Sequence, residues 1–492
     1  MRNKVLAIDL GTQSVRAGIV TPKGYIDAVV QVNHEVDSPY ENWAQQNPQQ
    51  WWIELQYAVK QLLDKSEINS DDIAAVACCG QMHGPTGIDS EGNITTSMTQ
   101  LWCDKRNQQI VDRIRKKTDT HLLMQITANP PTTGWVALKV KWEKEHQSNA
   151  YQRTKWYLVP KDYINFKLTG VAATDPSEAS GSFLWDYQIE QYSETMADLL
   201  DVDISKFPPV HKSHEIIGKV TKIVSLETGI PEGTPVVAGG GDFIVSLLGL
   251  GLIEQGIAID MTGTSTLFVF QKKEPIIHPR VQNLHHVLEG WIPFIMLDSG
   301  GLSIKWIKDV LDVVSKEEIL FDTIIKLAET VPAGSDGLIF YPYLLGERNP
   351  ENPNAKGIFL NLTINHTAAH MARAVMEGVT LSLAREIQSF RELGVQFSKV
   401  LLVGGGTRNK LLSKMKADIW NVPVVVTDEP ESSLKGAGML GALGVGLINS
   451  ISEVNLPKEE EIFSPDPKVV KQYQFVIRKF NRFYDHMCGY WV

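Results

Sequence analysis

Residues 4–20, KVLAIDLGTQSVRAGIV, contain two apolar runs separated by a polar turn. Apolar runs of this length on either side of small and hydroxyl residues are typical of a β-hairpin. We therefore expect strands over residues 4–8 and 15–20, with DLGTQS as the turn between them. Asp9 then stands where the first strand enters the turn.

A similar unit returns at residues 257–269, IAIDMTGTSTLFV, where IDMTGTS takes the place of IDLGTQS. A chance match between two short hairpins is the alternative to an internal duplication. The chain has 492 residues, too many for one ordinary core, and the two units lie about 250 residues apart, which suits two domains. The spacing favours duplication.

Strands and helices alternate through the rest of the chain, which indicates an α/β fold with mixed sheets. Residues 72–80 and 399–405 are apolar runs that end in glycine, and residues 365–394 have helical periodicity. Glycine and proline cluster at residues 228–241, where we place the domain junction. We expect an N-terminal domain over residues 1–238 and a C-terminal domain over residues 239–492, with the last helix packing back on the first domain.

The composition excludes several classes of protein. Hydrophobic residues make up 43% and charged residues 21%, and the net charge is −10. An acidic chain gives no electrostatic support for binding nucleic acid. The four cysteines form no CxxC motif, which indicates reduced thiols and a cytoplasmic location. The most apolar late stretch, residues 436–448, is too short for a membrane span.

Two hydroxyl-rich turns are candidate phosphate sites. Gly11-Thr12-Gln13-Ser14 and Thr262-Gly263-Thr264-Ser265 can point backbone N–H groups and hydroxyls into one concavity, which suits phosphate oxygens. Two ordinary hairpins are the alternative. Asp9 and Asp260 precede these turns, and a carboxylate beside a phosphate is tolerated when it binds Mg²⁺ or orients its water shell. We therefore expect Asp9 to lie at a magnesium site.

Two glycine-rich turns follow apolar runs, VVAGGGDFIV at 236–245 and VLLVGGGTRN at 400–409. Asp242 on the first turn can accept a proton from the nucleophile in phosphoryl transfer. A helix N-cap is the other role for this aspartate, since FIVSLLGLG follows it. The second turn lacks the acid and offers bare backbone that a flat ring such as adenine can approach.

Three other motifs have ordinary structural explanations. GAGMLG at 436–441 fits a dinucleotide fingerprint, but a polar segment separates it from the preceding strand, so we expect a helix-packing motif. HTAAH at 366–370 could share a metal between two histidines, but it lacks the glutamate of a zinc protease, so we expect surface or capping histidines. No GxxxxGK[ST] sequence is present, so this is not a Walker P-loop protein.

On these residues the chain resembles the FGGY carbohydrate kinases, within the larger group of actin-like ATPases. The resemblance covers nearly the whole chain and is carried by several pieces: AIDLGTQSVRAGIV, CCGQMHGPTGID, LWCDKRN, LVPKDYINFKLTG, TDPSEASGSFLWD, AGGGD, YLLGERNPENPNAKGIFLNL, AVMEGVTLSLAREIQSFRELG and VGGGTRN. It implies two duplicated actin-like (ribonuclease H-like) α/β domains around a cleft that closes on ATP and a sugar. GQMHG at 80–84 is the form typical of family members that act on xylulose, which implies ATP-dependent phosphorylation of D-xylulose to its 5-phosphate.

The resemblance also implies roles for single residues. Asp242 is implied as the catalytic base and a sugar contact, Met82 and His83 as further sugar contacts, and Asp9 as the residue nearest Mg²⁺. The implied ATP contacts are Thr12, Gln13, Ser14, Gly263, Thr264, Gly301, Lys305, Gly405, Gly406 and Asn409. ATP and Mg²⁺ are the implied cofactors, and a small sugar is the implied partner, with neither nucleic acid nor membrane.

Some positions depart from the family pattern and leave the sugar open. Cys103 stands where asparagine is usual, Glu143 where an apolar residue is usual, and Asn361 where glycine is usual. The alternatives are a kinase for ribulose, another ketose or a polyol, and a catalytically inactive sugar sensor. Dimers are common in the family, so a homodimer is an open possibility.

Overall fold

The computed structural model of the chain describes residues 2–65, 68–315, 320–348, 351–427 and 429–491. By its contacts the chain divides into two compact units, each built from interleaved segments. Unit 1 comprises Met1–Ile253, Lys272–Ile292 and Glu431–Pro457, and unit 2 comprises Glu254–Gln271, Pro293–Pro430 and Lys458–Val492. Asp242, which we assigned to the C-terminal domain, therefore lies in unit 1.

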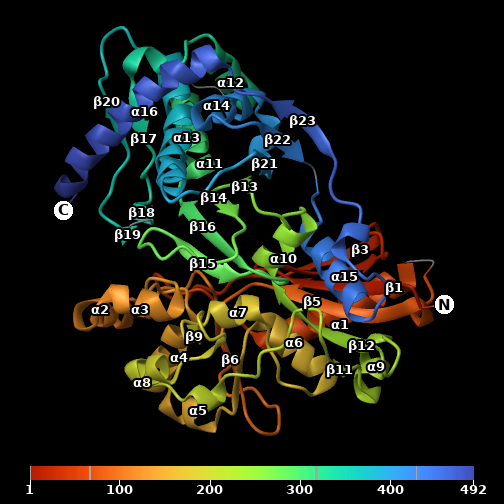
Figure 1. Cartoon of the computed structure of the whole chain (residues 1–492). Coiled ribbons are helices and arrows are strands. Elements are labelled where there is room, and N and C mark those ends of the chain that lie inside the picture. The colour runs from red at the N-terminus through yellow and green to blue at the C-terminus, as the bar shows by residue number, and fades with distance from the viewer. Residues whose placement is uncertain (1, 66–67, 316–319, 349–350, 428, 492) are drawn as a thin grey trace. The chain divides into compact units, whose positions relative to one another are not determined.

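Unit 1 is built around a six-stranded mixed sheet in the order β11-β12-β5-β1-β2-β3 (Figure 1). The predicted hairpin is present as β1 and β2, which pair antiparallel, while β5 and β12 continue the sheet in parallel. The strands are β1 (Lys4–Leu10), β2 (Ser14–Val20), β3 (Ile26–Asn33), β5 (Ile73–Gly80), β11 (Ile216–Lys219) and β12 (Pro235–Gly241). Because β1, β5 and β12 are buried on both faces, their sequences are almost continuously apolar.

Unit 2 contains a second mixed sheet with the consecutive order β16-β14-β13-β21-β22-β23. The second predicted hairpin is present as β13 and β14, and β21 and β22 continue in parallel from β13. The strands are β13 (Ile257–Thr262), β14 (Thr266–Phe270), β16 (Trp291–Leu297), β21 (Lys399–Val403), β22 (Val424–Thr427) and β23 (Glu459–Phe463). The region predicted as a strand at 399–405 ends two residues earlier, at Val403.

The two sheets have the same layout. In each, a hairpin is followed on one side by an antiparallel strand and on the other by two parallel strands and an antiparallel edge strand. Asp9 and Asp260 occupy corresponding positions on β1 and β13. The internal duplication predicted from IDLGTQS and IDMTGTS is therefore present in the fold.

Several helices of unit 1 pack against its sheet, and one of them contains the GAGMLG motif. The helices in contact with the sheet include α1 (Pro48–Lys65), α6 (Pro160–Thr169), α7 (Pro176–Ser180), α10 (Asp242–Gly249) and α15 (Ser432–Gly444). α4 (Val136–His146) and α9 (Lys222–Thr228) belong to the same unit. A Cβ at Gly436 would lie 2.0 Å from the Val245 carbonyl oxygen, and one at Gly438 would lie 2.4 Å from Val20. The glycines of α15 allow it to contact α10 and the sheet closely, so the predicted helix-packing role is confirmed.

Helices of unit 2 include α11 (Gly300–Ser315), α12 (Phe321–Glu329), α13 (Ala368–Glu392), α14 (Lys410–Trp420) and α16 (Pro467–Met487). The last helix, α16, packs against α13 and α14 within this unit, and its expected packing on the first domain stays a prediction. His370 forms a capping box with Thr367 at the start of α13, and His366 accepts the Thr363 N–H, so the predicted capping role holds. Among the described residues, no helix combines the length and apolarity needed to cross a membrane.

Candidate active site

Asp9 and the turn before Asp242 are brought together by the register of three parallel strands. Asp9 on β1 lies opposite Cys79 on β5, and Cys79 lies opposite Gly240 on β12. Neighbouring strands are about 4.8 Å apart, so both acids lie at the same edge of the sheet. The carboxyl ends of parallel strands are where α/β folds usually place their ligands.

Asp242 is the first residue of α10, and the N-cap is Gly241, so the N-cap role considered from the sequence is wrong by one position. Its Oδ1 accepts the N–H of Phe243 at 2.6 Å. Burial and the negative charge of Asp9 raise the pKa of Asp242 to about 7. A carboxylate with this pKa can exchange a proton near neutral pH.

The pKa of Cys79 shows that Asp9 and Asp242 lie near the same thiol. Its thiol is buried, and burial together with the charges of Asp9 and Asp242 raises the pKa of Cys79 well above its ordinary value. The thiol is therefore neutral and adds no charge beside the two carboxylates.

Asp9 is 2% exposed, and its two oxygens have different surroundings. Oδ2 accepts hydrogen bonds from Arg16 and, at 2.7 Å, from the hydroxyl of Ser433. Arg16 also donates to Glu431 at 2.9 Å, so it is shared between two acids. Oδ1 has no hydrogen-bond partner among the described residues.

The free Oδ1 of Asp9 suits a hard cation. Mg²⁺ is commonly bound by one or two carboxylates, its own waters and substrate phosphates rather than by a complete protein cage. No group of three or more His, Cys, Asp or Glu side chains that could enclose a metal occurs in the described part of the chain. The donor set therefore fits an ion that enters with a nucleotide.

Met82 and His83 lie on the loop after β5, next to the Asp242 turn. A Cβ at Gly241 would lie 2.6 Å from the side chain of Met82, so Met82 packs directly on the residue before Asp242. His83 has a left-handed backbone, with φ of +67°, and its ring meets Trp135 edge to face at a centroid distance of 5.2 Å. The glycine at 181 is required because its Cβ would lie 2.5 Å from this ring.

Lys139 from α4 supports the strained peptide of His83. Its ammonium is buried and donates to the His83 carbonyl at 3.1 Å. Burial lowers the pKa of Lys139 to about 7, and burial together with the Lys139 charge lowers the pKa of His83 to about 3. The imidazole of His83 is therefore neutral at pH 7, and a neutral imidazole has one donor and one acceptor nitrogen.

The first predicted phosphate turn, Gly11 to Ser14, joins β1 to β2 beside Asp9. Gly11 N–H donates to the Ser14 carbonyl at 2.9 Å, which closes the turn. The buried Gln46 donates to the Thr12 carbonyl and accepts from Gln81, each at 2.8 Å. One side chain thus connects this turn to the loop that contains Met82 and His83, while Gln13 remains exposed.

The second predicted phosphate turn, in unit 2, packs against the start of α11. The carbonyls of Gly263 and Thr264 accept N–H groups of Gly301 and Leu302 at 3.1 and 3.0 Å. A Cβ at Gly301 would lie 2.0 Å from the Gly263 oxygen, so this close contact requires glycine. Lys305, one turn further along α11, is exposed and pairs with Asp309 at 2.5 Å.

The predicted adenosine turn follows β21 in the same unit. Gly405 is exposed, and nothing lies within 4 Å of a Cβ placed on it, whereas a Cβ at Gly406 would lie 2.8 Å from Thr262. Asn409 is buried and accepts the Leu412 N–H at 2.9 Å as the N-cap of α14. Gly405 therefore presents bare backbone outward, while the side-chain oxygen of Asn409 already accepts the Leu412 N–H.

Asp260, the counterpart of Asp9, is fully buried and fully paired. Its Oδ1 accepts from Thr262 at 2.9 Å, and its Oδ2 pairs with the buried ammonium of Lys416. Lys416 also donates to Thr262 at 2.8 Å. This acid has a structural role in its own unit.

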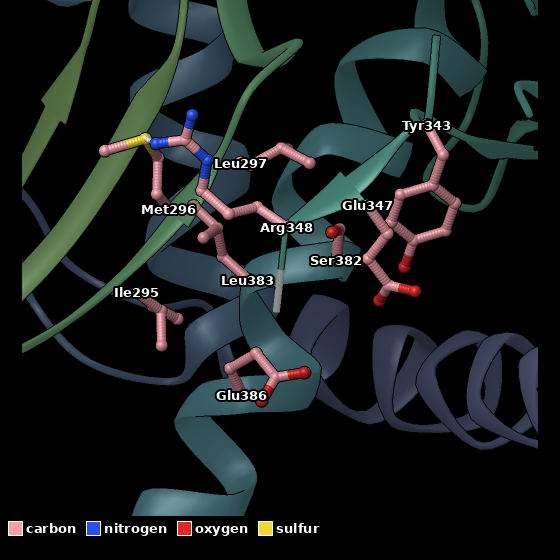
Figure 2. Close-up of a pocket in the computed structure, with 9 residues that line it drawn as sticks. All are labelled: Ile295, Met296, Leu297, Tyr343, Glu347, Arg348, Ser382, Leu383 and Glu386. Carbon is pink, nitrogen blue, oxygen red and sulfur yellow. Dashed lines mark hydrogen bonds between the residues drawn. The ribbon is translucent and has the colours of Figure 1, made fainter. Parts of the chain in front are cut away.

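A small pocket in unit 2 does not fit a substrate (Figure 2). Its volume is about 20 Å³, room for a single water molecule. The charged side chains around it have partners, since Arg348 pairs with Asp298 and Glu347 accepts from Tyr484. The pocket lies against β16 and α13 and is lined by residues that include Ile295, Met296, Leu297, Arg348, Leu383 and Glu386.

The departures from the family pattern have physical explanations at two positions. Asn361 has φ of +66°, and asparagine is one of the few residues other than glycine that adopt this conformation readily. Glu143 is fully buried, and burial raises its pKa to about 8, so it is neutral at pH 7 in a place where apolar residues are usual. For Cys103 the structure gives no such reason.

Several residues of the site were missed from the sequence. Arg16 was detectable, because a hairpin register that closes the turn at Gly11 to Ser14 pairs position 16 with Asp9. Ser433, Gln46 and Lys139 come from distant segments, and no local pattern indicates them.

Comparison with known proteins identifies the family to which the chain belongs. Residues 4–249 match the N-terminal domain of the FGGY family of carbohydrate kinases, and residues 261–445 match its C-terminal domain. The chain belongs to the FGGY family of carbohydrate kinases. As a member, it is a phosphotransferase that uses ATP and a carbohydrate, so the predicted fold class and enzyme class are confirmed.

Individual relatives of this FGGY kinase cover almost its whole length. Xylulose kinase of Bacillus subtilis (strain 168) is 30% identical over 488 residues, 98% of this chain and 97% of that protein. The crystal structure of xylulose kinase from Rhodospirillum rubrum has a TM-score of 0.92 at 26% identity, and gluconate kinase from Lactobacillus acidophilus has 0.93 at 23%; each covers 99% of both chains. At 23% identity the likeness to gluconate kinase shows the fold alone. Because xylulose kinase and gluconate kinase share this fold, the fold does not decide the sugar.

Proposed function

We propose that this kinase phosphorylates D-xylulose at its 5-hydroxyl with Mg-ATP, and that Asp242 is the general base. The observation that carries the proposal is the position of Asp242, at the end of β12, beside Met82 of GQMHG, with its pKa raised to about 7 by burial and Asp9. The xylulose kinases among the relatives support the choice of sugar.

In the proposed reaction, the Asp242 carboxylate accepts the proton of the sugar hydroxyl as its oxygen attacks the γ-phosphorus of ATP. The new O–P bond forms, the bond to the β-phosphate oxygen breaks, and ADP leaves. Met82 and the neutral imidazole of His83 orient the sugar. A primary alcohol is a weak acid, so a base matched to neutral pH contributes most as charge develops on its oxygen.

The remaining predicted residues are proposed to bind the nucleotide. Bound Mg²⁺ would offset negative charge on the transferred phosphoryl group, with Asp9 Oδ1 as its contact, directly or through water. Backbone N–H groups and hydroxyls of the two turns would contact the phosphates, and Gly405 the adenosine. The proposed nucleotide contacts are Thr12, Gln13, Ser14, Gly263, Thr264, Gly301, Lys305, Gly405, Gly406 and Asn409.

The test is ADP release with Mg-ATP across a panel of ketopentoses, ketohexoses, polyols and gluconate, with Asp242→Asn run alongside. We expect the highest kcat/KM with D-xylulose, and a loss of roughly 10²- to 10⁴-fold in the variant. ATP binding by the variant, measured by calorimetry, should be retained. A preference for another sugar would overturn the substrate, and near-normal turnover by Asp242→Asn would overturn the base.

A further inference from the structure

The turn that leads into Asp242 has no side chains of its own to fix it. Gly239 is in a left-handed conformation with φ of +73°, and a Cβ there would lie 1.8 Å from the Cys78 carbonyl oxygen. A Cβ at Gly240 would lie 2.5 Å from Val287. Close packing therefore requires glycine here, and glycine leaves the backbone with more freedom than any other residue does. The direction of Asp242 therefore depends on bonds to the backbone of this turn, which include the pairing of Gly240 and Gly241 with β5.

Ser177 makes such a bond at the residue before Asp242. The N–H of Gly241 donates to Ser177 Oγ at 3.0 Å. The Ser177 hydroxyl in turn donates to Asp175 Oδ2 at 2.7 Å. Because a hydroxyl has one proton, the bond to Asp175 turns that proton away from Gly241 and leaves an acceptor lone pair facing it.

Asp175 is fully buried and is itself firmly bonded. Its Oδ2 also accepts from the Ser177 N–H at 2.9 Å and from the hydroxyl of Ser213 at 3.0 Å. Its Oδ1 lies 3.0 Å from the ammonium of Lys161, which is fully buried as well. Burial alone would lower the pKa of Lys161, but Asp162 and Asp175 hold it above its usual range, so the lysine stays charged.

The same buried cluster bonds the other end of the glycine turn. Lys161 donates to the Ala238 carbonyl at 3.2 Å, and Asn165 donates to the same oxygen at 2.9 Å. The turn from Ala238 to Gly241 is thus fixed at its carbonyl end by Lys161 and at its N–H end by Ser177. Asp175 connects these two contacts.

We propose that Ser177 is a positioning residue for the catalytic base, and that it acts by orienting the Gly241–Asp242 peptide, with Asp175 and Lys161 supporting it. This inference rests on the proposed role of Asp242. Small displacements of a reacting group are costly, since a shift of about 1 Å can lower the rate a hundredfold. The contact of Ser177 is with the peptide, not with any substrate.

Ser213 provides a matched control. It is as buried as Ser177, and its hydroxyl donates to the same oxygen of Asp175. Its side chain has no bond to the glycine turn, while its backbone carbonyl accepts from Gly239, a contact that substitution leaves in place. Ser177→Ala and Ser213→Ala therefore remove equivalent bonds to Asp175, and only the first removes the acceptor of Gly241.

The experiment measures kcat and both KM values for these two variants on the best sugar. We expect Ser177→Ala to lower kcat by about tenfold to a hundredfold with the ATP KM unchanged. Ser213→Ala should keep kcat and both KM values within about twofold of the wild type.

Equal kcat values in the two alanine variants would overturn the inference. If Ser177→Ala does not fold, Ser177→Cys keeps the size of the side chain with a weaker acceptor and should show a smaller loss in the same direction. Asp242→Asn separates the two proposals. If that variant is active, the proposed base is wrong; if it is inactive while Ser177→Ala is normal, only the positioning role is wrong.

Discussion

The β1–β2 and β13–β14 hairpins carry an aspartate at the same position of two similar sheets, yet the two acids have different surroundings. Asp9 shares Oδ2 with Arg16 and Ser433, keeps Oδ1 without a partner, and raises the pKa of Asp242. Asp260 has both oxygens bonded, to Lys416 and Thr262, and is fully buried. One acid keeps an oxygen without a hydrogen-bond partner, and the other has both oxygens bonded within a core.

The difference shows that two copies of a motif can keep the same backbone while their acids have different partners. In unit 1 the cation that pairs with Asp9 is Arg16, which lies on β2 within the same hairpin. In unit 2 the cation that pairs with Asp260 is Lys416, which lies on α14, outside the hairpin. Lys416 pairs with Oδ2 of Asp260 and Thr262 donates to its Oδ1, so both oxygens of this acid have partners. The motif alone therefore predicts the turn, and its neighbours decide which acid keeps an oxygen without a partner.

The largest expected effect in this comparison is that of Asp9→Asn on turnover. The substitution removes the charge next to Asp242 and the proposed magnesium contact, and we expect kcat to fall roughly 10²- to 10³-fold. Stability should change little, because Arg16 keeps its bond to Glu431 at 2.9 Å. The measurements are ADP release over a magnesium titration and thermal unfolding. Full activity in this variant would remove the distinction between the two acids.

Asp260→Asn should have the opposite effect, a loss of stability with little loss of chemistry. It leaves the ammonium of Lys416, whose side chain is 3% exposed, without its anion. Removing one partner of a buried ion pair typically costs about 3–5 kcal/mol. Urea unfolding measures that cost, and kcat per folded molecule should stay within a few-fold of the wild type. A variant of normal stability that cannot turn over substrate would show that Asp260 is not merely structural.

Much of the scaffold was predictable because it depends on local patterns. Apolar runs around IDLGTQS and IDMTGTS gave both hairpins, and their similarity gave the duplication. The glycines of α15 were correctly assigned to helix packing. The interleaving of the two units was not predictable, since it depends on which distant segments pack together, and it moved Asp242 from the expected C-terminal domain into unit 1.

The site was predictable to a smaller extent. Asp9 lies near the end of β1, Asp242 begins α10, and Met82 and His83 lie on the loop after β5. Sequence patterns are informative at such strand ends, and all four residues belong to one unit. The pKa of Asp242 depends on burial and on Asp9, which only the sheet register brings near. Charge neutralisation by Arg16 follows from that register as well, whereas the contact of Lys139 with His83 follows from tertiary packing alone.

The pH dependence of turnover tests the link between Asp9 and Asp242. A base must be deprotonated to accept a proton, so below its pKa of about 7 the rate should fall tenfold per pH unit, and above it the rate should level off. Asp9→Asn removes a negative charge that raises this pKa, so the limb in its residual activity should move to lower pH. Asp260→Asn should leave the limb unchanged. A limb that stays in place in Asp9→Asn would mean that the two carboxylates do not interact.

The smallest effect on turnover is expected for Gly405→Ala, and Gly240→Ala in the other glycine turn provides a comparison for stability. A Cβ at Gly240 would lie 2.5 Å from Val287, so alanine there should lower the melting temperature. A Cβ at Gly405 has nothing within 4 Å and no positive φ to strain it, so alanine there should leave the melting temperature unchanged. If adenosine approaches this backbone as proposed, the added methyl group should raise the KM for ATP a few-fold and leave the KM for the sugar as it is. An unchanged KM for ATP would mean that the exposed glycine has no nucleotide beside it, and the adenosine contact would then have to be sought elsewhere in unit 2.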